Sequence, residues 1–171
     1  WLGNELEKKG FKVYLPEMPE TEIPKMELWI PCLKKQVGVA DKDTYFVGHS
    51  IGCLTTLRYL EKNNEKIGGA VLVAPWITLN PESFTTPEDK QVVDSWTAGS
   101  FNWPKLKNLC HNFVALFSED DPDVPFAENE PIFRKELGAK IIVEKDKGHF
   151  TSEKGVDELP VVLEELLKMA E

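Results

Sequence analysis

Short apolar runs that alternate with helical patterns constrain the fold of this chain more than any other feature. Nearly continuous apolar content predicts buried strands at 11–15, 44–47, 69–74, 112–117 and 140–144. Helical patterns lie at 2–9, where Gly10 closes the helix, at about 24–37, at 51–63, within 126–137 and from Pro160 to about Met169. Pro131 predicts that the fourth of these helices begins only near Glu130. The alternation predicts an α/β fold of three layers, with helices on both faces of a mostly parallel sheet.

The start of the chain departs from this order. Trp1 leads directly into the helical pattern at 2–9, whereas an α/β domain normally opens with a strand. We therefore expect the first strand of the fold, and the loop after it, to be missing.

The segment from about 76 to 107 is too long for a simple connection. We expect a single domain over residues 1–171, in which this segment forms a small cap-like insertion after the strand that follows the third helix. Trp76, Phe101 and Trp103 in it could line a substrate pocket or could pack the insertion onto the sheet. The sequence leaves both uses open.

Composition narrows the classes of partner. The net charge is −9 and the isoelectric point is about 4.9, so nucleic acid and anionic membrane surfaces would be repelled. No apolar run is long enough to cross a bilayer. Cys32, Cys53 and Cys110 are widely spaced, which disfavours a disulfide framework or a zinc site and predicts a reducing cytoplasm. We expect no metal and no cofactor. The oligomeric state cannot be read from the sequence.

One motif carries chemistry. Residues 48–52 read G-H-S-I-G, a G-x-S-x-G pattern between a predicted strand and a predicted helix. This is the setting of a nucleophile elbow, a sharp turn that lifts a serine hydroxyl out of a sheet. We expect Ser50 to be strained there, and a side chain at Gly48 or Gly52 to clash with the adjoining strand or helix. Ser50 could otherwise simply cap the helix.

An acid and a histidine follow in the chain order that a Ser-Asp-His triad needs. Asp121 follows one predicted strand and His149 follows the next, so both fall at the sheet edge where sites are built. Asp121 is preferred as the acid, and Asp120 and Asp123 could instead cap the turn or face solvent. The other two histidines fit less well. His49 points away from its neighbour Ser50 and should shape the elbow, while His111 precedes a strand and lies at the wrong end of the sheet.

Taken together, these motifs resemble the RBBP9/YdeN family of small serine hydrolases in the α/β-hydrolase superfamily, over Trp1 to about Lys168. The markers are Glu5-Leu6-Glu7-Lys8, Trp29-Ile30-Pro31, the G-H-S-x-G motif, Ala70-Val71-Leu72-Val73, Asp120-Asp121-Pro122 with Val124-Pro125, and Gly148-His149-Phe150. The resemblance implies a compact α/β-hydrolase fold with Ser50, Asp121 and His149 as catalytic residues. It also implies small-molecule or peptide substrates cleaved at an ester or amide bond. The family's opening strand and Gly-rich loop, and the L-x-C-x-E motif of one branch, have no match here.

We therefore expect a metal-free serine hydrolase that forms an acyl-enzyme at Ser50. The backbone N–H of Ile51 is the expected oxyanion donor, and no residue suggests a second donor. The alternative is an inactive protein that keeps the hydrolase fold and serves as a binding module.

Overall fold

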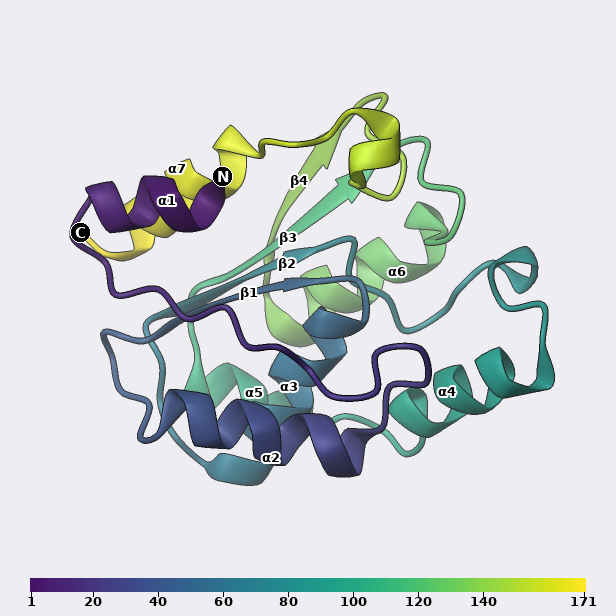
Figure 1. Cartoon of the computed structure of the whole chain (residues 1–171), viewed down its shortest axis with the longest axis horizontal. Coiled ribbons are helices and arrows are strands. Elements are labelled where there is room, and N and C mark those ends of the chain that lie inside the picture. Colours follow the sequence, from purple (N-terminus) through teal and green to yellow (C-terminus); the bar gives the residue numbers. More distant parts are fainter.

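The computed structural model describes residues 1–171 and is built around a sheet of four parallel strands (Figure 1). The strands stand side by side in chain order: β1 Tyr45–His49, β2 Gly69–Val73, β3 Phe113–Ser118 and β4 Lys140–Glu144. The helices are α1 Leu2–Lys8, α2 Met26–Val37, α3 Ile51–Asn63, α4 Pro87–Thr97, α5 Trp103–Leu109, α6 Phe126–Ile132 and α7 Pro160–Met169. Short helical turns occupy Pro81–Ser83, Phe133–Leu137 and Ser152–Lys154.

Helices cover both faces of the sheet. Right-handed crossovers between strands that advance in one direction place their helices on the same face. Accordingly α3 and α5 lie with α2 on the lower face in Figure 1, while α1 and α7, from the two ends of the chain, lie on the upper face. This confirms the three-layer α/β prediction. None of the helices is both long enough and apolar enough to cross a membrane.

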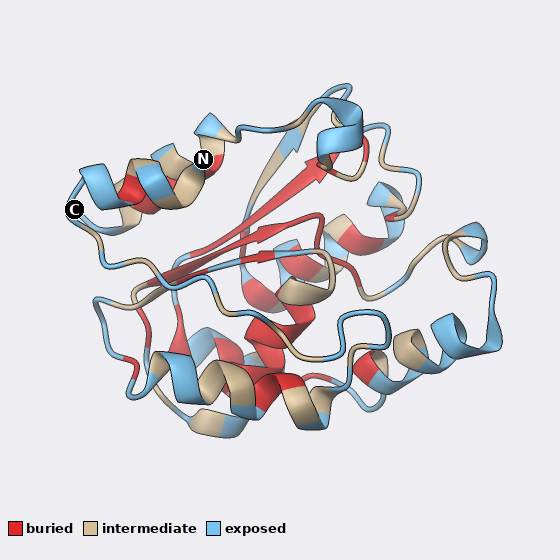
Figure 2. Ribbon diagram, viewed as in Figure 1, coloured by how far each residue is buried: buried red, intermediate tan, exposed pale blue.

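The core lies at the centre of the sheet (Figure 2). Every residue of β2 and β3 is buried, whereas the edge strands β1 and β4 are only partly covered. Helix α3 is buried continuously from Cys53 to Leu60. Its Thr55 and Thr56 hydroxyls donate to the carbonyls of Ile51 and Gly52, so two polar side chains are satisfied inside the core. The helix that follows the elbow is therefore a rigid support.

Two predicted elements need correction. Helix α6 begins at Phe126 rather than near Glu130, with Pro131 inside it. A proline there removes one helical hydrogen bond, and a π-helical turn over Phe133–Leu137 follows immediately. The predicted strand at 11–15 has no regular structure. The other four strands and the remaining helices are confirmed, with ends shifted by no more than two residues.

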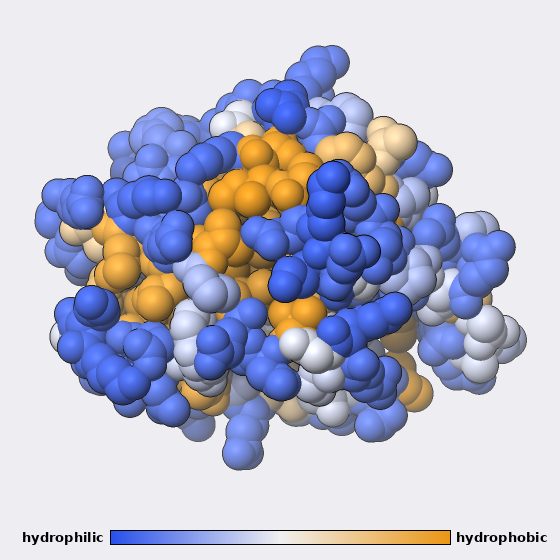
Figure 3. Space-filling view, turned by 90° about the horizontal axis from the view of Figure 1, so that it is seen from above, coloured by the Kyte–Doolittle hydropathy of each residue, from blue (hydrophilic) through white to orange (hydrophobic).

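The failed strand has a clear physical reason. The sheet ends at β1, and no ladder joins its free edge to residues 11–16; the two segments instead line a groove of about 670 Å³. Without a neighbouring strand, an extended segment cannot form the ladder that defines a strand. The groove is lined by exposed apolar side chains, among them Leu15, Val39 and Val47. Seen from above, apolar side chains also gather near the middle of the molecular surface, framed by hydrophilic ones (Figure 3).

The aromatic insertion folds onto the helical layer. Helix α4 lies beside α2 (Figure 1), where Trp96 packs edge-on against Trp29 with ring centroids 5.8 Å apart. The Trp96 indole N–H donates to the carbonyl of Pro24. Arg58 of α3 contacts the end of α4 and the residues that follow it. Its guanidinium donates to the carbonyls of Trp96 and Ala98 and stacks on the ring of Phe101. The insertion is thus bound to both α2 and α3.

Candidate active site

Ser50 occupies a strained turn between β1 and α3. Its φ of +52° and ψ of −120° lie in a region that side chains rarely adopt. The Ser50 N–H donates to the carbonyl of Val73 at 2.9 Å, which ties the turn to the end of β2. The strain expected of a nucleophile elbow is therefore present at this serine.

The two glycines of the motif differ. A Cβ on Gly48 would lie 2.5 Å from the carbonyl oxygen of Gly52, so no side chain fits at position 48. A Cβ on Gly52 would meet nothing within 4 Å, because Gly52 lines the open groove. The predicted clash is thus correct for Gly48 and wrong for Gly52.

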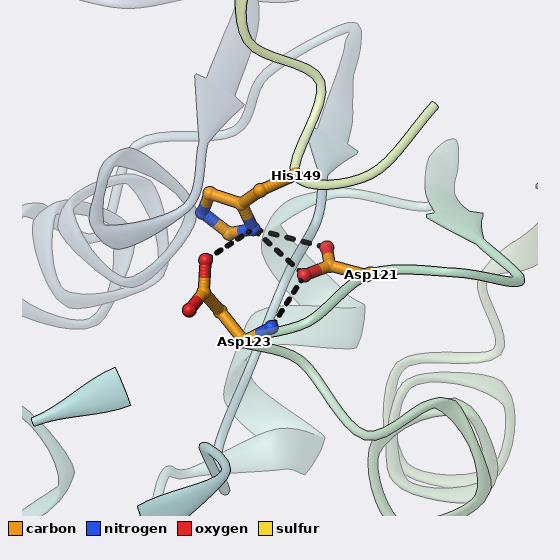
Figure 4. A group of neighbouring side chains, drawn as sticks. All are labelled: Asp121, Asp123 and His149. Atoms are coloured by element: carbon orange, nitrogen blue, oxygen red, sulfur yellow. Dashed lines mark hydrogen bonds and ion pairs between the residues drawn. The ribbon is translucent and has the colours of Figure 1, made fainter. Parts of the chain in front are cut away.

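Asp121 is the carboxylate that holds His149 (Figure 4). Its two oxygens lie 3.0 and 3.1 Å from Nδ1 of His149, and its side chain is only 2 % exposed. One oxygen, Oδ1, also accepts the N–H groups of Asp123 and Val124, which fixes the orientation of the carboxylate. Asp123 lies 3.8 Å from the same nitrogen and is 37 % exposed. Of the three candidate acids, Asp121 has the closest and most buried contact.

Asp120 has a role that the sequence did not reveal. Its Oδ1 accepts the Ser118 hydroxyl at 2.6 Å and the N–H groups of Lys147 and Gly148 at 3.0 Å each. The Ser118 hydroxyl and these amides lower the pKa of the Asp120 carboxyl. Asp120 therefore neither caps its own turn nor faces solvent unpaired, but joins the end of β3 to the loop that carries His149.

His49 also contacts that loop. Its Nε2 lies 2.8 Å from the carbonyl oxygen of His149, and the two imidazole rings are 4.9 Å apart. Because a carbonyl only accepts, Nε2 of His49 must carry the proton. Desolvation of the ring lowers the pKa of His49, which favours the neutral imidazole with its proton on Nε2. The expectation that His49 only shapes the elbow is incomplete, and the missing signal was a contact across 100 residues of chain.

Ser50 and the Asp121–His149 pair lie at the same end of the sheet, just past the carboxyl ends of the strands. The ring of His49, the residue before Ser50, lies against the ring of His149, with the two ring planes tilted by 51°. The Ser50 hydroxyl and the His149 ring are not hydrogen-bonded to each other in this structure. Ile51 is the first residue of α3, so its N–H has no helical partner and stands next to Ser50. His111 is exposed and precedes β3, at the opposite end of the strands.

The predicted pocket aromatics lie in different surroundings. Phe101 and Trp103, with ring centroids 5.0 Å apart, help to line a cavity of about 410 Å³ together with Ile77. Trp76 is 2 % exposed, and its indole N–H has no hydrogen-bond partner within the protein. Contact of these side chains with a substrate remains a prediction.

Three side chains, His149 among them, have a spacing that could suit a metal ion. Asp121, Asp123 and His149 offer three ligand atoms within 4.8 Å of one another. However, Nδ1 of His149 is already directed at both oxygens of Asp121, and such a hydrogen bond requires a proton on that nitrogen. A metal ion at Nδ1 would have to replace this bond, so the geometry favours an Asp–His pair.

Known proteins with similar sequences show which family this chain belongs to. The serine hydrolase family matches residues 4–168. The hydrolase YdeN of Bacillus subtilis (strain 168) is 29 % identical over 168 residues, which cover 97 % of this chain and 84 % of YdeN. The serine hydrolase RBBP9 of Rattus norvegicus is 25 % identical over 151 residues, covering 88 % of this chain and 76 % of RBBP9.

Solved structures of hydrolases have the same fold as this chain. The crystal structure of YdeN superposes with a TM-score of 0.88 and 28 % identity, over 99 % of this chain and 88 % of YdeN. The meta-cleavage product hydrolase CumD of Pseudomonas fluorescens has a TM-score of 0.67 at 14 % identity, over 98 % of this chain and 84 % of CumD, and shows the shared fold alone. This chain therefore belongs to the serine hydrolase family within the α/β-hydrolase superfamily, and it is an enzyme with hydrolytic activity.

Proposed function

We propose that Ser50, His149 and Asp121 form the catalytic triad of an esterase or amidase that acts through an acyl-enzyme. The observation that carries the proposal is the buried Asp121–His149 hydrogen bond, which lies at the same sheet edge as the strained Ser50. A carboxylate on Nδ1 leaves Nε2 of the imidazole free to act as a base. Fixed strain at a serine on such an edge is typical of a nucleophile.

The reaction has two halves. In the first, Nε2 of His149 takes the Ser50 proton as Oγ bonds to the substrate carbonyl carbon. The tetrahedral intermediate then expels the alcohol or amine, which receives that proton, and the acyl group stays on Ser50. In the second half, His149 deprotonates a water, whose oxygen bonds to the acyl carbon. The bond from that carbon to Ser50 Oγ then breaks, His149 returns the proton to Oγ, and the carboxylic acid leaves.

The oxyanion of each tetrahedral intermediate needs a donor that is already in place. The Ile51 N–H serves here, because it stands beside Ser50 at the positive end of helix α3. The lack of a hydrogen bond between Ser50 and His149 is compatible with this scheme, since catalytic hydrogen bonds often tighten only when substrate is bound.

A fluorophosphonate probe tests the proposal, because it labels only an activated serine. We expect labelling of the wild-type protein and none of Ser50→Ala. Ser95→Ala, which removes an exposed hydroxyl on α4, is the matched control and should be labelled normally. Hydrolysis of p-nitrophenyl acetate should follow the same pattern. Labelling that persists in Ser50→Ala would overturn the assignment of the nucleophile.

A further inference from the structure

The loop of residues 145–151, here called the His149 loop, has a backbone that its own sequence does not favour. Asp146, Gly148 and Phe150 all have φ between +52° and +56°, and two of these three residues carry side chains. Left-handed conformations of this kind persist only where surrounding contacts impose them. The position of His149 must therefore be set by what holds the loop.

Polar side chains from the ends of β3 and β1 hold its backbone, and Ser118 at the end of β3 shares the Lys147 N–H with Asp120. Asp120, after β3, accepts the N–H groups of Lys147 and Gly148, the two residues that precede His149. His49, at the end of β1, donates to the carbonyl of His149 itself. Asp120 uses its Oδ1 for three donors, and His49 uses its Nε2 proton on the carbonyl.

We propose that His49 and Asp120 are positioning residues that together clamp the His149 loop and so set the distance between the imidazole and Ser50. The proposal rests on the function proposed above, in which His149 is the base. Asp121 fixes the rotation of the imidazole through Nδ1, while the clamp fixes the backbone from which the ring projects. Each residue of the triad is thereby tied to its neighbours: His49 precedes Ser50 in the chain, and Asp120 precedes Asp121.

Substitution pairs separate the parts of the clamp. His49→Phe keeps a ring beside His149 but removes the donor, whereas His49→Gln keeps a donor. Asp120→Ala removes the acceptor, whereas Asp120→Asn keeps a neutral one. His111→Phe is the control for replacing an exposed histidine outside the site.

We expect His49→Phe and Asp120→Ala each to lower kcat for p-nitrophenyl acetate by about 10- to 100-fold, with KM changed less than threefold, because misplacing a base affects the chemical step. His49→Gln and Asp120→Asn should recover most of the loss, and His111→Phe should match wild type. The double variant His49→Phe/Asp120→Ala should lose little more than the worse single variant, since both act on one loop. The downfield NMR signal of the His149 Nδ1 proton should broaden in the two single variants.

Wild-type kcat in both single variants, or effects on KM alone, would overturn the clamp. So would a double variant whose kcat falls by the product of the two single losses. If Asp120→Ala does not fold, the His49 pair decides in the same way. His149→Ala and Ser50→Ala are assayed alongside. If those two stay active, the proposed function has failed, whereas their inactivity beside wild-type-like clamp variants refutes the clamp alone.

Discussion

The carboxylate that orients His149 can be identified by changing one oxygen at a time. Asp121 and Asp123 both face Nδ1 of His149, at 3.0 and 3.8 Å. Replacing each by asparagine preserves shape, removes the charge and turns one carboxylate oxygen into an NH₂ donor. Because Oδ1 of Asp121 accepts two backbone N–H groups, an asparagine there keeps its oxygen on those amides. Its NH₂ group then takes the place of Oδ2, 3.0 Å from Nδ1.

An NH₂ group at that position reverses the hydrogen bond. It can donate only to an unprotonated Nδ1, so the imidazole proton moves to Nε2, the nitrogen that must accept the serine proton. Holding a catalytic histidine in this wrong tautomer lowers kcat by about 10⁴-fold. The half-exposed contact of Asp123 is screened by solvent and contributes about 0–1 kcal/mol, so Asp123→Asn should lower kcat by no more than about fivefold.

The assay is steady-state hydrolysis of p-nitrophenyl acetate by both variants, with thermal melting to confirm that each is folded. NMR of ¹⁵N-labelled imidazole reports the tautomer of His149 directly. Equal losses in the two variants would refute the reasoning, and so would an Asp121→Asn enzyme that keeps more than a tenth of the wild-type kcat.

Two further predictions concern stability. Gly48→Ala places a methyl group 2.5 Å from a backbone oxygen and should lower the free energy of unfolding by about 1–3 kcal/mol. The methyl group of Gly52→Ala meets nothing within 4 Å, so this variant should be neutral or stabilised by up to about 1 kcal/mol, because alanine favours the helix. Urea unfolding compares the two variants, and equal losses of stability would contradict the steric argument. Glu165 is buried, which opposes its charge, but its bonds to Lys140 and Lys168 outweigh this and lower its pKa. Its unfolded pKa is higher, so its contribution of about 1 kcal/mol is present above pH 4.5 and lost as the pH falls further. Glu165→Gln should therefore melt lower at pH 7 but lose less between pH 5 and 3, and parallel melting curves for the two proteins would contradict this.

The sequence predicts local features well and contacts between distant segments poorly. Four strands, the elbow at Ser50 and the helix beginning at Ile51 depend on adjacent residues, and the structure places them as expected. The predicted strand at 11–15 is wrong because a strand needs a hydrogen-bonded partner, and the backbone of this segment pairs with none of the four strands. The parts played by Asp120 and His49 could not be predicted, since their partners lie about 27 and 100 residues away.

Backbone strain is concentrated at the edge of the sheet that carries the proposed site. Six residues other than glycine have positive φ; two of these, Ser50 and Ala74, directly follow strands, and two more, Asp146 and Phe150, lie in the loop after β4. Each such residue costs about 1–3 kcal/mol, a sizeable share of the 5–15 kcal/mol that stabilises a typical domain. The fully buried strands β2 and β3 lie between the strained turns and accept their amides, since Ser50 donates to Val73 and Ala74 to Leu116. The buried centre of the sheet thus offsets the strain at the carboxyl ends of its strands. A substitution that shortens a buried side chain of β2 or β3, and so leaves a cavity, should impair catalysis before it unfolds the protein.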